Sequence, residues 1–93
     1  MDLTALQLLL GEIYVTQKKY PEAIAVYEQA SKFDNKDFRP VLAKALVLKE
    51  QGKTTESQPL FEEAVTLAPG EYKDQVKEIA AQNSQNSLSP QED

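Results

Sequence analysis

The sequence predicts an all-α fold, an α-solenoid built from two antiparallel helix pairs and a closing helix. Three observations support this: apolar residues recur with helical spacing, the polar breaks between these segments are short, and the pattern returns after 34 residues. The matched positions are Leu8 and Leu42, Ile13 and Val47, Gln17 and Gln51, Lys19 and Lys53, Glu22 and Glu56, Tyr27 and Phe61, Ala30 and Ala64, Phe33 and Leu67, and Phe38 and Tyr72. Stacked supersecondary units produce such a period.

The first helix pair covers about residues 3–17 and 21–33. The first helix is apolar around most of its surface, with Leu6, Leu9, Leu10, Ile13 and Tyr14 on one face and Leu8 and Val15 beside it. Pro21 suits the first turn of the second helix, where its missing N–H costs nothing. The predicted buried face of that helix consists of Ala23, Ile24, Tyr27, Ala30 and Phe33.

The second pair covers about residues 38–50 and 54–67. Asp37 is the expected N-cap of its first helix, and Gly52 can take the left-handed conformation that ends it. Pro59 lies one turn inside the following helix, where it removes a backbone hydrogen bond. A closing helix is expected over 72–82, and the polar segment 83–93 has no apolar period, so we expect it to be disordered.

Composition excludes several functions. The 93 residues include no His and no Cys, so the usual general base, thiolate and zinc ligands are missing, and no glycine cluster could hold a phosphate. The net charge of −5 and the interspersed Lys and Arg argue against nucleic acid as a partner. We therefore expect no enzyme activity, catalytic residue, metal or cofactor, and no membrane insertion.

The spacing resembles the tetratricopeptide repeat, whose unit is 34 residues long. Repeat one would span 4–37 and repeat two 38–71, with 72–82 as the capping helix and 1–82 as the domain. The positions that carry the resemblance are Leu10, Gly11, Tyr14, Tyr20, Ala23, Tyr27 and Ala30 in repeat one, and Ala45, Leu48, Gly52, Phe61, Ala64 and Pro69 in repeat two. Departures are Gln7 and Val41 at the usual Trp position, Lys44 at a Leu position, Ser57 at an Ala position and Asn35 at a Pro position. The resemblance implies a right-handed solenoid.

The resemblance also implies a concave groove lined by the first helix of each pair. The partner-binding residues expected there are Leu8, Leu9, Glu12, Arg39, Leu42, Leu46, Lys49, Lys73, Val76 and Lys77. Leu8, Leu42 and Val76 would form an apolar line, with Arg39, Lys73 and Lys77 at its later end. Some family members clamp the terminal carboxylate of a chaperone tail, but Leu8, Glu12 and Ala43 stand where that clamp needs Lys and Asn.

The resulting expectation is a protein-interaction scaffold that takes a partner peptide or helix in the groove. The family includes chaperone cofactors, secretion factors and assembly factors, so the resemblance leaves the partner open. We expect a cytoplasmic protein, although the segment from Leu67 to Tyr72 also resembles bacterial and plastid members of the family.

The first helix is unusually apolar for the end of such an array, since terminal repeats normally have a polar outer face. Two repeats are also fewer than the three or so usually needed for stability. We therefore expect either a fragment of a longer repeat protein with neighbouring repeats missing, or, as the alternative function, self-association into a homodimer through this helix.

Overall fold

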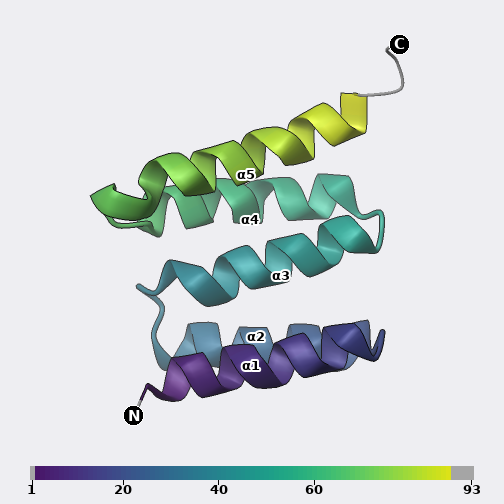
Figure 1. The fold of residues 1–93 in the computed structure, drawn as a ribbon, viewed down its shortest axis with the longest axis vertical. Coiled ribbons are helices and arrows are strands. Elements are labelled where there is room, and N and C mark those ends of the chain that lie inside the picture. The colour runs from purple at the N-terminus through teal and green to yellow at the C-terminus, as the bar shows by residue number, and fades with distance from the viewer. Residues whose placement is uncertain (1, 89–93) are drawn as a thin grey trace.

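The computed structural model describes residues 2–88, with side chains to Gln82, as five consecutive α-helices (Figure 1). Their bounds are α1 Leu3–Thr16, α2 Tyr20–Phe33, α3 Phe38–Glu50, α4 Thr54–Leu67 and α5 Gly70–Leu88. Each helix packs against the next, and α1 also contacts α3. The array measures 46 × 32 × 17 Å, so it is a thin, stacked slab, and the predicted all-α solenoid is confirmed.

The helices form two layers, with α2 behind α1 and α4 behind α5 in the view of Figure 1. Small residues bring the paired helices together. Gly11, Ala23, Ala30, Ala45, Ser57 and Ala64 are all buried, as the repeat pattern predicts. Phe33 departs from the prediction, because it lies off the face formed by Ala23, Tyr27 and Ala30 and is 63% exposed.

The core consists of two clusters, one in each half of the array. One joins Ala23 and Tyr27 of α2 to Val47 of α3. The other joins Val41 to Ala64, Ala68 and Val76. Each cluster therefore joins neighbouring helices across the boundary between one helix pair and the next.

The turn inside each repeat is built in the same way. Lys19 N–H donates to the Tyr14 carbonyl at 2.8 Å, and Lys53 N–H donates to the Leu48 carbonyl at 2.8 Å. The residue before each donor lies in the left-handed region, Lys18 with φ 62° and Gly52 with φ 82°. The expected role of Gly52 is confirmed, while Lys18 takes the same conformation against the preference of a residue with a Cβ.

The helix starts follow the expected capping chemistry in two cases. Asp2 accepts a hydrogen bond from Ala5 N–H at 3.2 Å, and Asp37 accepts one from Arg39 N–H at 3.0 Å. Pro59 does not end α4, since at this depth it removes only a single backbone bond.

The closing helix is longer than expected. It begins at Gly70, and its backbone remains helical past Gln82 to Leu88. The expected disordered tail of residues 83–93 stays a prediction: the backbone of 83–88 continues the helix, and residues 89–93 lie outside the described part of the chain. The loss of apolar period after Gln82 removes packing, but no Pro or Gly occurs there before Pro90 to stop the helix.

Candidate protein-binding face

The predicted groove would lie on the face that α1 and α3 present on one side of the slab. Leu42, Leu46 and Lys49 follow one another at i, i+4 and i+7, so they share one side of α3. Leu46 is 40% exposed, whereas Leu42 is half-buried and packs against the core cluster around Val41. On α1, Leu8 is likewise half-buried against the other cluster.

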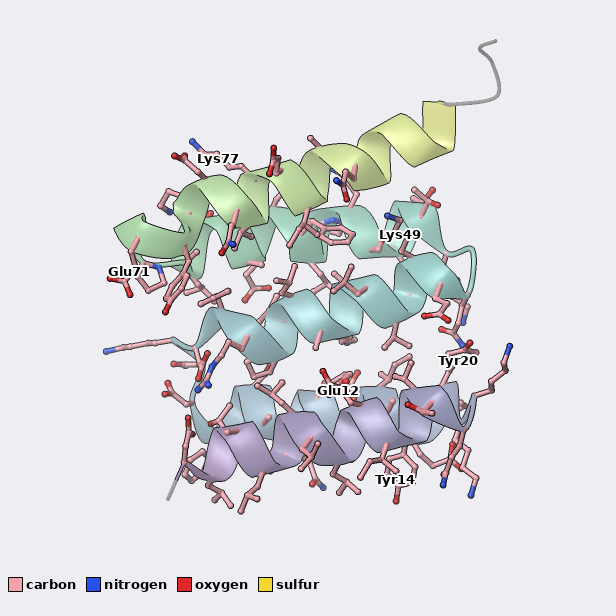
Figure 2. All side chains as sticks on the ribbon, in the orientation of Figure 1. Glu12, Tyr14, Tyr20, Lys49, Glu71 and Lys77 are labelled. Carbon is pink, nitrogen blue, oxygen red and sulfur yellow. The ribbon has the colours of Figure 1, made fainter. Side chains whose placement is uncertain are left out.

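Charged residues flank the apolar residues Leu42 and Leu46 of α3. Glu12 lies on the side of α1 that faces α3, and Lys49 lies near the C-terminal end of α3 (Figure 2). Lys49 makes no ion pair with a described residue, and Glu50 beside it accepts a hydrogen bond from the Tyr20 hydroxyl at 3.2 Å. Burial and this bond together raise the pKa of Tyr20.

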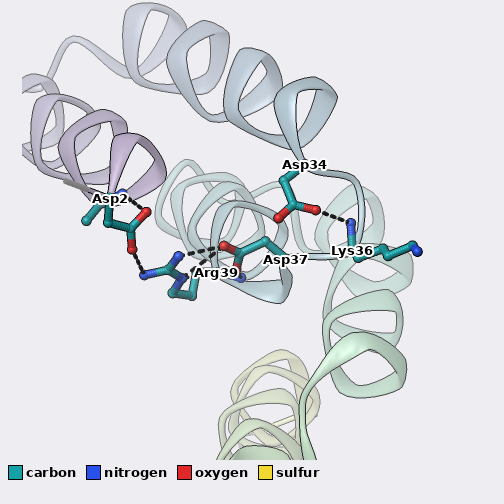
Figure 3. A network of polar contacts seen from close by, with 6 residues as sticks. Asp2, Asp34, Lys36, Asp37 and Arg39 are labelled. Atoms are coloured by element: carbon teal, nitrogen blue, oxygen red, sulfur yellow. Dashed lines mark hydrogen bonds and ion pairs between the residues drawn. The ribbon is translucent and has the colours of Figure 1, made fainter.

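The basic end of the predicted site is occupied by internal contacts. The guanidinium of Arg39 makes a two-pronged bond to Asp37, at 2.6 Å to one carboxylate oxygen and 3.0 Å to the other, and a further ion pair with Asp2 at 3.2 Å (Figure 3). This bond holds the pKa of Asp37 below its usual range. Because Asp2 and Asp37 cap α1 and α3, Arg39 joins the starts of the two repeats.

Lys73 is also engaged. Its ammonium donates to the carbonyls of Val65 and Thr66 at the C-terminal end of α4, where free carbonyls and the helix dipole favour a cation. Of the three cations expected at this end of the face, Lys77 alone is exposed without a protein partner among the described residues, and it lies on the outer side of α5 (Figure 2).

Val76 is not a surface residue, contrary to its expected place in the apolar line. It is 2% exposed and belongs to a core cluster. The reason is that Val76 packs together with Val41, Ala64 and Ala68, so the side of α5 that carries it is covered. Asp74 and Glu78 occupy the positions of Pro40 and Lys44, and these acids are exposed rather than packed inward. The helix instead packs its apolar residues onto α4.

Leu9 also differs from expectation, because its place in the repeat lies outside the face that carries Leu46. The residue that matches it in repeat two is Ala43, which packs against the cluster that contains Ala23 and Tyr27 of α2. Leu9 therefore occupies the side of α1 that would face a preceding helix, and it is 54% exposed there. What remains of the predicted face is Leu8, Glu12, Leu42, Leu46 and Lys49.

A concave feature lies on the opposite layer. A depression of about 230 Å³ lies between α2, α3 and α4, and its lining residues are Glu28, Ser31, Lys32, Val41, Lys44, Leu60 and Glu63. Lys44 and Glu28 form an ion pair across it at 2.7 Å, which lowers the pKa of Glu28. The presence of Lys44 at a position where Leu is usual was the sequence signal for this pair.

In the described residues, no group of acidic side chains is placed to hold a metal ion. None of the helices described here combines the length and the apolar character that crossing a bilayer requires.

Comparison with known proteins identifies the repeat. Residues 11–56 match the family model described as TPR repeat. This segment therefore carries the tetratricopeptide repeat pattern. The chain is also 32% identical over 66 residues to the protein SLOW GREEN 1, chloroplastic, of Arabidopsis thaliana, a match that covers 71% of this chain and 21% of that protein. The chain therefore spans about a fifth of the length of this relative. No solved structure matches the chain.

Proposed function

We propose that this chain is a non-catalytic scaffold that binds a protein segment on the face formed by α1 and α3. The family supports the general statement, because tetratricopeptide repeats are protein-interaction modules. One observation carries the choice of face. Leu46 is 40% exposed although α3 lies inside the array and contacts α1, α2 and α4. Its exposure therefore does not come from the lack of a neighbouring helix.

The chemistry of the face suggests the kind of segment. Leu46 and the accessible part of Leu42 offer an apolar anchor, and Lys49 one turn further along α3 offers a cation. Glu12 across the face disfavours an acid on the α1 side. A segment with an apolar side chain followed by an acidic residue matches this pattern, and it can be helical or extended.

The test uses a library of random peptides displayed on phage, with the intact chain as bait. We expect the selected peptides to carry an apolar residue near an acid. Leu46→Glu should raise the Kd of such a peptide by at least about tenfold, because it places a carboxylate in the apolar anchor. Phe33→Glu is the matched control, since Phe33 is 63% exposed on another helix.

Retention of affinity by Leu46→Glu, or an equal loss in both variants, would refute the assignment of the face. Circular dichroism of each variant checks that the helices are intact. Failure to select any peptide would count against peptide binding itself.

The location of the protein remains a separate prediction. A cytoplasmic setting is the expectation from the sequence, and the chloroplastic relative is compatible with the organellar origin that the sequence also left open. Fractionation of the source cells with an antibody to the chain distinguishes the two.

A further inference from the structure

The side of α1 that points away from the rest of the array is strongly apolar. It consists of Leu6, Leu9, Leu10 and Ile13, which we call the outer face of α1. Their spacing is i, i+3, i+4 and i+7, so they form one continuous stripe. Each of the four side chains is between 43 and 54% exposed. A single exposed leucine is ordinary on a protein surface, but a contiguous apolar patch marks an interaction site.

The repeat itself shows what such a stripe does. The residues that match it in α3 are Pro40, Ala43, Lys44 and Val47. Val47 belongs to the same cluster as Ala23 and Tyr27 of α2, Ala43 packs against that cluster, and Lys44 binds Glu28 of α2. Pro40 is fully buried. The outer face of α1 is therefore the counterpart of a surface that another helix covers in repeat two.

The rest of the described chain offers no free surface of the type that covers α3. The corresponding side of α2 is already covered by α3, and that of α4 is covered by α5. The outer side of α5 is polar, with Asp74, Gln75 and Glu78 exposed. A head-to-tail contact would therefore set the apolar residues of α1 against these polar side chains, which disfavours it.

Charge favours contact between two α1 helices. Within Leu3–Thr16 the sole side chain charged at neutral pH is Glu12, and it lies on the side that faces α3 rather than on the stripe. With a net charge of −5, two copies repel each other. This repulsion is weaker when they meet through α1 than through a helix that carries several charges. Leu10 stands at the position that Lys44 occupies in repeat two. The outer face of α1 therefore has no cation that would require an acidic partner such as Glu28.

We propose that the outer face of α1 binds the same face of a second copy, which gives a two-fold, head-to-head dimer. An uncharged apolar stripe is complementary to a second copy of itself. A contact that uses the same surface on both copies is complete with two chains and does not extend into a fibre. This inference does not rest on the proposed peptide-binding function, because Leu46 and Lys49 lie on a different helix and remain uncovered by it.

Two-fold symmetry makes a specific geometric prediction. When a helix meets its own copy about a two-fold axis across the middle of the stripe, the two copies run antiparallel, and residues near the midpoint meet themselves. Leu9 and Leu10 lie at the midpoint of the stripe, whereas Tyr72 lies at the other end of the array.

Sedimentation equilibrium over a concentration series tests the association. We expect the mass to rise towards twice that of the monomer for the unaltered chain. Leu6→Gln combined with Leu10→Gln should raise the dimer dissociation constant by at least about a hundredfold, because polar amides then replace two aliphatic anchors on each side. Leu46→Gln is the matched control, and it should leave the mass unchanged.

Cysteine cross-linking tests the symmetry without disturbing the rest of the surface, since the chain contains no other Cys. Under mild oxidation Leu10→Cys should give a disulfide-linked dimer, and Tyr72→Cys should not. A monomeric mass up to about millimolar concentration, an unchanged dimer in the double variant, or equal cross-linking from both cysteine variants would each overturn the proposal. Capture of a different protein by the α1 stripe, with the chain remaining monomeric, would overturn it in favour of a foreign helix.

Discussion

The two repeats share a backbone but differ in what surrounds them. Repeat two lies between α2 and α5, and its apolar residues are covered on both sides. Repeat one is covered on one side only, so α1 presents large aliphatic side chains to solvent while its counterpart α3 buries Pro40 and Val47. The same 34-residue pattern therefore specifies a core position in one repeat and an exposed position in the other.

The comparison between two phenylalanines gives the largest expected effect. Phe61 is fully buried in α4, and Phe33 is 63% exposed in α2. Phe61→Ala should lower the free energy of unfolding by about 3–5 kcal/mol, because it removes a buried ring and leaves a cavity. Phe33→Ala should change it by less than about 1 kcal/mol. Urea denaturation followed by circular dichroism measures both, and equal losses would contradict the difference in burial.

The close approach of α1 and α2 provides an intermediate effect. A Cβ added at Gly11 would lie 2.8 Å from the Tyr27 hydroxyl and closer still to the ring, so the ring must move. In repeat two the matched pair is Ala45 and Phe61. Ala45 has the methyl group that Gly11 lacks, and Phe61 lacks the hydroxyl that Tyr27 has. Overpacking costs about 1–3 kcal/mol, which exceeds the gain of about 1 kcal/mol in helix propensity from Ala. Gly11→Ala should therefore destabilise the chain.

The second substitution in this cycle is Tyr27→Phe. It recreates the pair found in repeat two, so the double variant should recover part of the loss caused by Gly11→Ala. The coupling free energy from the four denaturation curves should fall in the range of about 0.5–3 kcal/mol. Strict additivity would show that the hydroxyl is not what excludes the methyl group.

The smallest effect is expected at the contact between the starts of α1 and α3. Arg39→Gln should lower stability near neutral pH by no more than about 1 kcal/mol, since Arg39 is partly exposed. The folded-state pKa of Asp37 is lowered from about 3.8, so the stabilisation is complete above that value and is lost as the pH falls through the folded-state pKa. The stability difference between the two proteins should therefore shrink on acidification.

Denaturation midpoints at several pH values between about 6 and 2 measure this convergence. Lys36→Gln is a suitable control, because the Lys36 ammonium makes no ion pair with a described residue although its backbone N–H donates to Asp34 (Figure 3). A difference that persists unchanged at low pH would show that Arg39 acts through packing and not through its carboxylate partners.

The sequence predicted the fold well because its evidence was local and repeated. Helical spacing, the Asp37 cap and the Gly52 turn each follow from a few neighbouring residues. Small residues at Gly11, Ala23 and Ala30 predicted close helix contacts, and all three are buried.

The candidate site was harder to predict because it depends on how whole helices are rotated. The 34-residue match placed Val76 in an exposed apolar line with Leu42, but Val76 is buried in the core cluster against which Leu42 packs. The engagement of Arg39 and Lys73 depends on partners that periodicity does not identify, namely the Asp2 and Asp37 carboxylates and the carbonyls at the end of α4. Lys18 could not be foreseen either, since a turn with φ 62° normally selects glycine.

The match between Gly11 and Tyr27 has a consequence for how such proteins can be recombined. A single first helix cannot be exchanged between the two repeats, because Ala45 brought opposite Tyr27 would introduce the same overlap that Gly11 avoids. A helix transferred together with its partner carries both halves of the fit. For shuffling within this chain, or for grafting it into a designed array, the smallest interchangeable part is therefore the helical hairpin.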